Sequence, residues 1–435
     1  MGVPTVALVT RSFVDQCSSL KYVSGFPTQR LYFSPHPITG VPADICAEYL
    51  RGNDPITGRP LFTEIVEGLT VADPDDQKTG LLEFPRAETI GPDTPDNLEN
   101  FFMEKKWTDF MPIHLPTSSR VNDMLAGTSH NRDEVVGKMR STGYWRYREY
   151  TVEQIACNAV MAGCKPEYLP VVLAIAGTQS CHTSTSTTSF SSMLVINGPI
   201  RNEIGMNYKI GALGPYNHAN STIGRSWTII SKCQTNIGRA GEAYMGTQGN
   251  PLNYNNICFP ENEERLPPGW NPLHVQRGFQ PNESTVTTFS GWSHTFADQS
   301  FEWELLPQIP WWFALWSLAF GFGNRTALFD PDIAWRLYNE SGVSSKEEVS
   351  DYVAENATVL AWDYWNRSYG VQNFIRPGAV LGREPSATWL TYADDEPIKY
   401  LAGGVNIVVV GGETNQFWQL AAQNPTRTVS VDDWR

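Results

Sequence analysis

The stretch MGVPTVALVTRSF, residues 1–13, sets the fold class that we expect for this chain. Val3 to Thr10 is a run of apolar and β-branched residues, which is typical of a strand buried on both faces of a sheet. Apolar residues at near-helical spacing follow as far as Gly25, and RLYFS (30–34) predicts a second short strand. The order strand, helix, strand favours parallel strands joined by a crossover helix, as in α/β proteins.

Two further segments of helical periodicity complete this first unit. They are VPADICAEYLRG (41–52) and LFTEIVEGL (61–69), and a Pro/Gly-rich turn separates them. Residues 1–70 therefore predict half of a Rossmann-like or flavodoxin-like layer sandwich. Because a strand buried on both faces belongs in the middle of a sheet, we expect the rest of the layer to come from elsewhere.

Composition divides the remaining chain into two parts. Residues 71–106 are acidic, rich in proline and without hydrophobic periodicity, which predicts a linker. Residues 107–435 predict a larger α/β domain that carries the pocket, and no repeat of fixed period is found. Its clearest signals are a capping box at residues 151–154, a helix after Lys165-Pro166, a helix over 221–233 capped by Asn220 or Ser221, a strand over 192–199 and a wholly apolar last strand over 405–412.

Charge and hydropathy exclude several classes of function. The net charge of -14 lacks the concentrated basic face that nucleic acid or an anionic membrane requires. The segment IPWWFALWSLAFGFG (309–323) is too short for a membrane span, for which about 20 residues are needed, and it predicts a buried core helix. The N-terminus carries no secretory signal pattern, so we expect a cytoplasmic protein.

The cysteines and histidines give few chemical signals. Seven cysteines form no CxxC spacing and are expected to be reduced thiols. Cys181 and His182 are adjacent in sequence, but adjacency does not place a thiol against an imidazole in space, and a lone cysteine is more often a small core residue. No metal-binding spacing is present, and neither are a P-loop, a GxGxxG after a strand or a GxSxG elbow.

Two stretches concentrate the residues expected to form a site, VINGPIRNEIGMNYKIGALGPYNHANSTIGR (195–225) and ICFPENEERLPPGWNPLHVQRGF (257–279). Glycines there punctuate polar residues at strand ends and at a helix N-terminus, where backbone N–H groups can hold a carboxylate. The alternative is that Asn and Gly satisfy left-handed turns and that Glu261 and Glu263 lie in a solvated loop. The candidate substrate-binding residues are Asn197, Gly198, Asn207, Asn217, Asn220, Arg225, Glu261 and Glu263.

Three further residues are candidates for catalysis. His182 and His274 would transfer protons, since imidazole is the side chain that titrates nearest to neutral pH. Arg277, together with the helix N-terminus near Asn220, would anchor negative charge on a substrate.

Several stretches also resemble a known family. GVPTVALVTRSF (2–13) with RLYFSPHPITGVP (30–42) resembles the second half of the domain of the UGSC family of (seleno)proteins, in which a strand is followed by a Sec/Cys-Gly-Ser-Cys loop. WTDFMPIHLPTSSRVNDMLAGT (107–128), VINGPIRNEIGMN (195–207) and GALGPYNHANSTIGR (211–225) resemble the large bacterial and fungal proteins associated with that domain. The resemblance covers about residues 1–70 and 107–300.

The resemblance implies a function and a partner. The missing strands and the thiol loop would lie before Met1, so the reactive thiol would belong to a complementary chain in a hetero-oligomer. By analogy with the selenocysteine subunits of glycine and proline reductases, the assembly would be a thiol-dependent oxidoreductase or lyase acting on a small polar or carboxylate-bearing metabolite, with no cofactor indicated. This chain has Ser189 where related sequences carry a second histidine, which places any role that needs two histidines in doubt.

Two alternatives stay open. The chain could be a non-catalytic scaffold or maturation partner of a UGSC subunit. It could also be a self-contained hydrolase that uses Cys181 and His182 without an external thiol.

Overall fold

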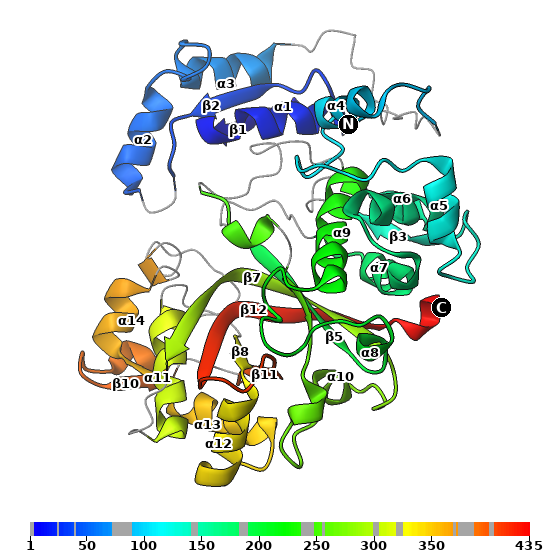
Figure 1. Cartoon of the computed structure of the whole chain (residues 1–435). Helices are drawn as coiled ribbons and strands as arrows, with labels where there is room; N and C mark the ends of the chain where they lie inside the picture. Colours follow the sequence, from blue (N-terminus) through cyan, green and yellow to red (C-terminus); the bar gives the residue numbers. More distant parts are fainter. Residues whose placement is uncertain are drawn as a thin grey trace.

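A computed structural model describes most of the chain (Figure 1). The described residues are 4–23, 26–38, 41–71, 89–140, 147–181, 190–235, 248–254, 257–298, 304–318, 325–368, 371–372, 387–399 and 404–435. The predicted α/β class is confirmed, because parallel strand pairs joined by helices occur both in the first 71 residues and in the large domain.

The N-terminal module, residues 4–71, has the predicted order of strand, helix and parallel strand. Strand β1 (Ala7–Thr10) pairs with β2 (Leu31–Ser34), and the turn η1 (Arg11–Phe13) and helix α1 (Val14–Val23) connect them. Helices α2 (Ala43–Arg51) and α3 (Leu61–Thr70) follow, as the periodicity predicts. Among the described residues no third strand pairs with this sheet, so both of its edges are open.

The segment predicted as a linker contains a helix. Residues 72–88 lie outside the described residues, but α4 spans Pro95–Glu104. The Thr94 side chain accepts a hydrogen bond from the Asn97 backbone N–H, and Pro95 occupies the first helical turn, where its missing N–H costs nothing. The segment predicted as a linker or a long surface crossing thus includes a helix in its last third, where the cap and the proline are helix-start signals.

The large domain is built on one mixed sheet of six strands. Their order in space is β11-β8-β12-β7-β5-β6. The strands are β5 (Ser191–Asn197), β6 (Ile257–Pro260), β7 (Thr285–Asp298), β8 (Thr326–Phe329), β11 (Asn406–Val409) and β12 (Phe417–Ser430). The two long strands β7 and β12 form a central antiparallel ribbon. Strand β5 pairs with β7 on one side and is followed by β6, and β8 pairs with β12 on the other side and is followed by β11.

This sheet has an internal two-fold repeat of topology. In each half a strand and its parallel partner are joined by a helical crossover, and a long antiparallel strand follows: β5, α9, β6, β7 in the first half and β8, α12, α13, β11, β12 in the second. The backbone N–H of Glu261 bonds to Ile196 O, and that of Val410 bonds to Phe329 O in the same place. Glu261 and Val410 are thus equivalent positions, although the sequence shows no repeat of fixed period.

The sheet coils until its outer strands meet, which gives it a barrel-like form. Asn262 N–H donates to Val409 O over 2.7 Å, and these residues follow or end the edge strands β6 and β11. Side chains from all six strands or their ends meet on the concave face: Met193, Val195, Phe259, Phe289, Leu328, Val408, Val410 and Ala421. The apolar strand predicted over 405–412 is β11, which is buried as predicted, but it is not the last strand of the chain, because β12 follows it.

Two groups of helices cover the outer faces (Figure 1). The first consists of α6 (Val152–Ala162), α7 (Leu169–Gly177) and α9 (His218–Thr235), which pack on β5 and β6. The second consists of α11 (Leu305–Leu318), α12 (Pro331–Ser341) and α13 (Lys346–Asn356), which pack on β8, β11 and β12. The smaller elements are α5 (Ser118–Leu125), β3 (Val135–Met139), β4 (Arg148–Thr151), α8 (Ile200–Glu203), α10 (Leu273–Gln276), β9 (Thr358–Leu360), α14 (Ala361–Arg367) and β10 (Pro397–Lys399).

Local signals placed most helix ends correctly. The capping box at Thr151 and Gln154 is present, and Pro166 begins the turn that leads into α7. Helix α9 begins earlier than predicted, because the side chain of Asn217 accepts a hydrogen bond from Asn220 N–H and caps it. Asn220 and Ser221, the predicted caps, lie inside the helix.

Residues 309–318 of the apolar segment lie in α11, and residues 319–323 lie outside the described residues. One face of this helix is in the core, but Trp311 and Leu315 are exposed, so the predicted buried helix is buried on one side. Among the described helices, none has both the length and the apolar character needed to cross a bilayer.

Candidate functional site

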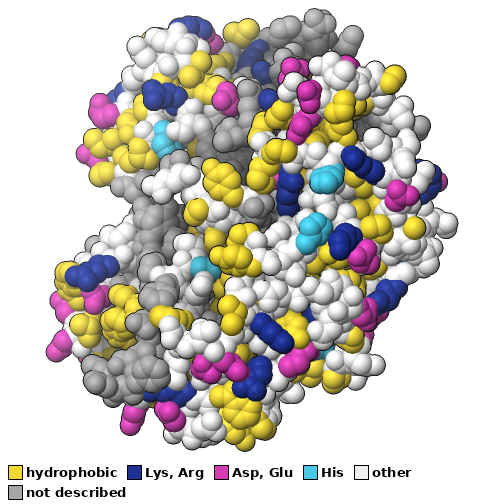
Figure 2. Space-filling view, viewed as in Figure 1, with side chains coloured by type: hydrophobic (Ala, Val, Ile, Leu, Met, Phe, Trp, Pro, Cys, Tyr) yellow, Lys and Arg dark blue, Asp and Glu magenta, His cyan; other side chains and the backbone are white. Residues whose placement is uncertain are grey.

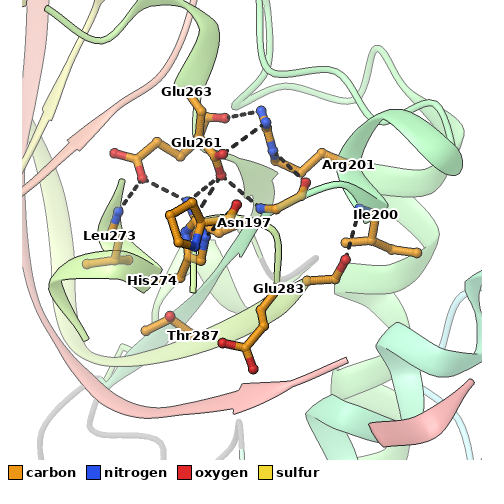
Figure 3. A network of polar contacts seen from close by, with 12 residues as sticks. Asn197, Ile200, Arg201, Glu261, Glu263, Leu273, His274, Glu283 and Thr287 are labelled. Carbon is orange, nitrogen blue, oxygen red and sulfur yellow. Dashed lines mark hydrogen bonds and ion pairs between the residues drawn. The ribbon is translucent and has the colours of Figure 1, made fainter. Parts of the chain in front are cut away.

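The candidate site lies where β5 and β6 end and where β11 meets them. We call the polar side chains there the Glu261 network, which is drawn in part in Figure 3. Its members are Asn197, Arg201, Glu261, Glu263, Glu264, His274 and Lys346. In α/β sheets the carboxyl ends of parallel strands are the usual position for a ligand, so these residues occupy the expected edge.

Glu261 is the centre of this network and is wholly buried. Its carboxylate accepts hydrogen bonds from Asn197 Nδ2 at 2.8 Å, from Leu273 N at 2.7 Å and from Lys346 Nζ at 2.6 Å. Burial alone would raise the pKa of Glu261, but the Lys346 ammonium and these hydrogen bonds together hold it below its ordinary value. Glu261 is therefore a fixed anion that ties three parts of the chain together.

Glu263 and Glu264 form the second part of the network, around Arg201. Glu263 Oε1 accepts from Asn197 Nδ2 and from Gly198 N, both at 2.8 Å, and its other oxygen lies 3.1 Å from Arg201 Nη2. The guanidinium also donates to both oxygens of Glu264, at 3.0 and 3.1 Å. Glu263, which could have lain in a solvated loop, is instead bound together with Glu264 by one buried arginine, and Glu264 extends outward to the surface.

Gly198 is required by this geometry. Its φ is +82°, and a Cβ at this position would lie 2.0 Å from Glu283 O. The close approach of two backbones lets Gly198 N–H point at Glu263. Glycine is therefore needed at position 198 because two backbone segments approach closely there, and not because the residue contacts a ligand.

His274 belongs to the network but does not face solvent. It is wholly buried, and its Nδ1 lies 3.9 Å from Glu263 Oε1 and has no hydrogen-bond partner. Its Nε2 is 3.4 Å from Pro281 O. His274 stays a candidate for proton transfer, and its buried imidazole lies beside Glu263.

A hollow of about 220 Å³ opens beside the network, between α10, α13 and β11. Lys346 and Leu273 form part of its wall, and both contact Glu261. Arg277 also lines it, and its guanidinium has no carboxylate partner among the described residues. This position is consistent with the predicted role of Arg277 as an anchor for negative charge.

The remaining predicted residues support loops. Asn207 and Asn220 bond to each other's backbone or side chain, and Asn217 caps α9 and donates to Gly205 O. Arg225 forms a two-pronged ion pair with Asp109, with distances of 2.8 and 3.0 Å. The structure thus gathers Asn197, Gly198, Glu261, Glu263, His274 and Arg277 around one place, whereas Asn207, Asn217, Asn220 and Arg225 serve the loops and the attachment of residues 109–112.

Several thiols of this chain are poorly suited to nucleophilic attack. Burial raises the pKa of Cys157 to about 11 and that of Cys164 to about 12, and it raises the pKa of Cys258 further. Cys181 is half-buried against the core beside α6, α7 and α9. His182 lies outside the described residues, so the predicted Cys-His pair is not placed.

Two members of the site escaped sequence reasoning, namely Arg201 and Lys346. Arg201 stands in the first of the two stretches that were singled out, and a count of buried opposite charges there could have paired it with Glu264. Lys346 follows Ser345 in SSKEEV, which is the pattern of an exposed helix start, and no local signal marks it as buried. Its position at 1% exposure depends on the packing of α13 on β11.

Comparisons with protein-family models, with curated proteins and with solved structures found no match to this chain. Among the residues that the structure describes, no group of three or more His, Cys, Asp or Glu side chains could hold a metal ion. Inferences about function therefore depend on the chemistry of the site and on the surfaces of the molecule.

Proposed function

We propose that this chain is the substrate-binding part of a thiol-dependent enzyme whose reactive thiol or selenol belongs to a complementary chain. The reaction would be reductive or lyase-type and would act on a small polar or carboxylate-bearing metabolite. The N-terminal module would receive the complementary chain, and the hollow beside the Glu261 network would bind the substrate. The observation that carries the proposal is the open, two-stranded parallel sheet of the N-terminal module.

The open sheet supports a missing partner for an energetic reason. Two strands bury too little surface to be stable alone, and parallel sheets are normally covered on both faces. The module also exposes large apolar side chains, at positions where a further layer would cover them. They are Leu8, Phe26, Ile38, Ile45, Leu50, Ile56, Phe62, Val66, Leu69 and Val71.

The space beside the module is also consistent with this arrangement. Figure 2 shows a deep notch between the N-terminal module at the upper left and the large domain below it. Hydrophobic side chains are visible along its walls. A complementary segment that extends the β1–β2 sheet would lie against these surfaces.

The chemistry of the thiols supports the same division of labour. A thiolate is the nucleophilic form of cysteine, and the raised pKa values of Cys157, Cys164 and Cys258 keep these thiols protonated at neutral pH. A sulfur or selenium nucleophile from another chain would avoid this limitation. The Arg277 guanidinium would then bind the carboxylate of the substrate, since arginine matches the geometry of a carboxylate.

The test is reconstitution with a partner that carries a Cys-Gly-Ser-Cys loop, encoded beside this gene. The chain alone should be inactive, the mixture should be active, and brief treatment with iodoacetamide followed by mass spectrometry should label the partner's loop before any cysteine of this chain. Cys181→Ser should keep most of the activity, whereas His182→Ala should lose most of it. If Cys181 is labelled first and activity falls with that label, the self-contained hydrolase is correct and the proposal is wrong.

The scaffold alternative gives a different result in the same assay. A scaffold would form the complex and protect the partner's loop, but Arg277→Gln would leave the activity of the complex unchanged. The proposal expects at least a tenfold loss from this variant, while the melting temperature changes little because Arg277 is exposed.

A further inference from the structure

The hollow beside the Glu261 network carries charges of both signs on walls from different elements. Helix α10 and its end contribute Gln276 and Arg277, and helix α13 contributes Lys346, Glu347 and Asp351. A simple anion site would carry cationic and neutral groups, because nearby carboxylates repel an anion. The mixture of signs therefore needs a different explanation.

Two of these charges are already committed to neighbours. Lys346 Nζ lies 2.6 Å from Glu261 Oε1 and is almost wholly buried. Glu347 Oε1 accepts a hydrogen bond from Gln276 Nε2 at 2.8 Å, which links the two walls. Neither group needs a ligand to complete its contacts.

The other two charges, Arg277 and Asp351, have no ion-pair partner among the described residues. Both line the same hollow, and they do not form an ion pair with each other. Both side chains belong to exposed residues and can therefore be reached from solvent. Among the residues that the structure describes, the hollow thus offers one cation and one anion that have no ion-pair partner.

We infer that the ligand of this hollow is a small zwitterion of the amino-acid type, with its carboxylate on Arg277 and its ammonium on Asp351. Arginine binds a carboxylate through two parallel hydrogen bonds, and an ammonium donates to a carboxylate. A ligand with both groups gains both contacts, whereas a plain carboxylate would face Asp351 and Glu347 without compensation. The inference rests on the proposed function and narrows its substrate class.

The size of the hollow sets the size of the ligand. Its volume of about 220 Å³ is below the roughly 300 to 1,000 Å³ of pockets that hold drug-sized ligands. This space suits a small amino acid but not a nucleotide or a peptide. Lys346 and Leu273, which line the hollow, connect a bound ligand to Glu261.

The experiment uses the full chain without any partner, so that binding is measured apart from the thiol reaction. The probes are two matched sets: alanine with propanoate and ethylamine, and 4-aminobutanoate with butanoate and propylamine. We expect at least one zwitterion to bind at least tenfold more tightly than its carboxylate and its amine analogues in isothermal titration calorimetry. Saturation-transfer NMR would report the same order.

Variants locate the site. Arg277→Gln and Asp351→Asn should each weaken binding of that zwitterion at least tenfold. Glu355→Gln, one turn further along α13 and outside the hollow, and Arg367→Gln, an exposed arginine on α14, should change it less than twofold. Equal binding of a zwitterion and its plain carboxylate would overturn the inference in favour of an anion site. The inference would also be overturned if no probe binds at concentrations up to about 10 mM, which is above the dissociation constants of weak specific complexes. Either result would leave the partner-supplied thiol open to its own test.

Discussion

The ammonium of Lys346 lies 2.6 Å from Glu261 Oε1, and neither side chain is more than 1% exposed. This pair joins α13 to the end of β6, and Glu261 also accepts from Val409 N, at 3.3 Å, at the end of β11. A buried ion pair is costly to break because the remaining charge has no partner.

We predict that Lys346→Met lowers the free energy of unfolding by about 3 to 5 kcal/mol, because it leaves Glu261 as an unpaired buried anion. The double variant Glu261→Gln with Lys346→Met should recover part of this loss. Urea unfolding at pH 7 measures both, with Glu48→Gln in the exposed Glu48–Arg51 pair as a control that should cost less than about 1 kcal/mol. A cost below that of the control would show that the buried pair does not hold the sheet closed.

His294, on β7, makes stability depend on pH. Burial lowers the pKa of its imidazole to about 4, although Gln419 and Gln423 beside it favour the protonated form. Since the unfolded chain titrates near 6.5, it binds a proton at higher pH than the native protein does. The neutral imidazole of His294 therefore contributes about 3 kcal/mol to the free energy of unfolding, at about 1.4 kcal/mol per pKa unit. This contribution is complete above pH 6.5 and is lost as the pH falls towards 4.

The comparison of His294→Gln with the parent chain isolates this effect. Asp330, whose pKa burial raises to about 6, acts in the opposite direction over an overlapping range, so a single unfolding curve would mix the two. From pH 7 to pH 4.5, the free energy of unfolding of the parent chain, measured with urea, should fall steadily relative to that of the variant. An imidazole resonance of His294 that titrates near 6.5 would contradict the prediction.

Gly198→Ala should destabilise the chain far more than Gly205→Ala. Both residues have positive φ, which costs roughly 1 to 2 kcal/mol for a residue with a Cβ. The Cβ at position 198 would also lie 2.0 Å from Glu283 O, whereas nothing lies within 4 Å of a Cβ at position 205. Thermal unfolding of the two variants measures the difference, and equal melting temperatures would mean that the backbone at Gly198 can move aside freely.

The chain on its own should self-associate through the N-terminal module. Its open edges and exposed apolar side chains are the features that drive association between sheets. Phe62→Glu should increase the monomer fraction in size-exclusion chromatography, because the side chain is 64% exposed on α3. Leu390→Glu, at 65% exposure outside the module, should leave the distribution unchanged. A clean monomer of the parent chain would count against the prediction.

The N-terminal module could be predicted because its signals are local. The apolar run before Thr10 and the periodicity of α2 and α3 reside in short windows of sequence. The central sheet could not be predicted, because β7 and β12 are rich in Thr, Ser and polar residues and pair although more than a hundred residues separate them in sequence. Nothing near Thr285 in the sequence indicates that its partner is Ser430.

The candidate site divides in the same way. Asn197 was predicted because it stands beside Gly198 where an apolar strand ends, and Glu261 because it belongs to an acidic cluster. The structure brings them together because β5 and β6 are parallel neighbours. Lys346 was missed because its burial comes from tertiary packing. The asparagines near α9 were overestimated, since an Asn that caps a helix or closes a turn has the same appearance in sequence as one that binds a ligand.

The place of β12 in the sheet has a consequence for synthesis on the ribosome. This strand comes late in the chain, after residue 416, but it lies in the middle of the sheet between β7 and β8. During translation at roughly 5 to 20 residues per second, β7 must wait on the order of ten seconds for its neighbour. For that time one side of a long, nascent strand is exposed to other chains, so this protein should depend on chaperones until its last residues emerge.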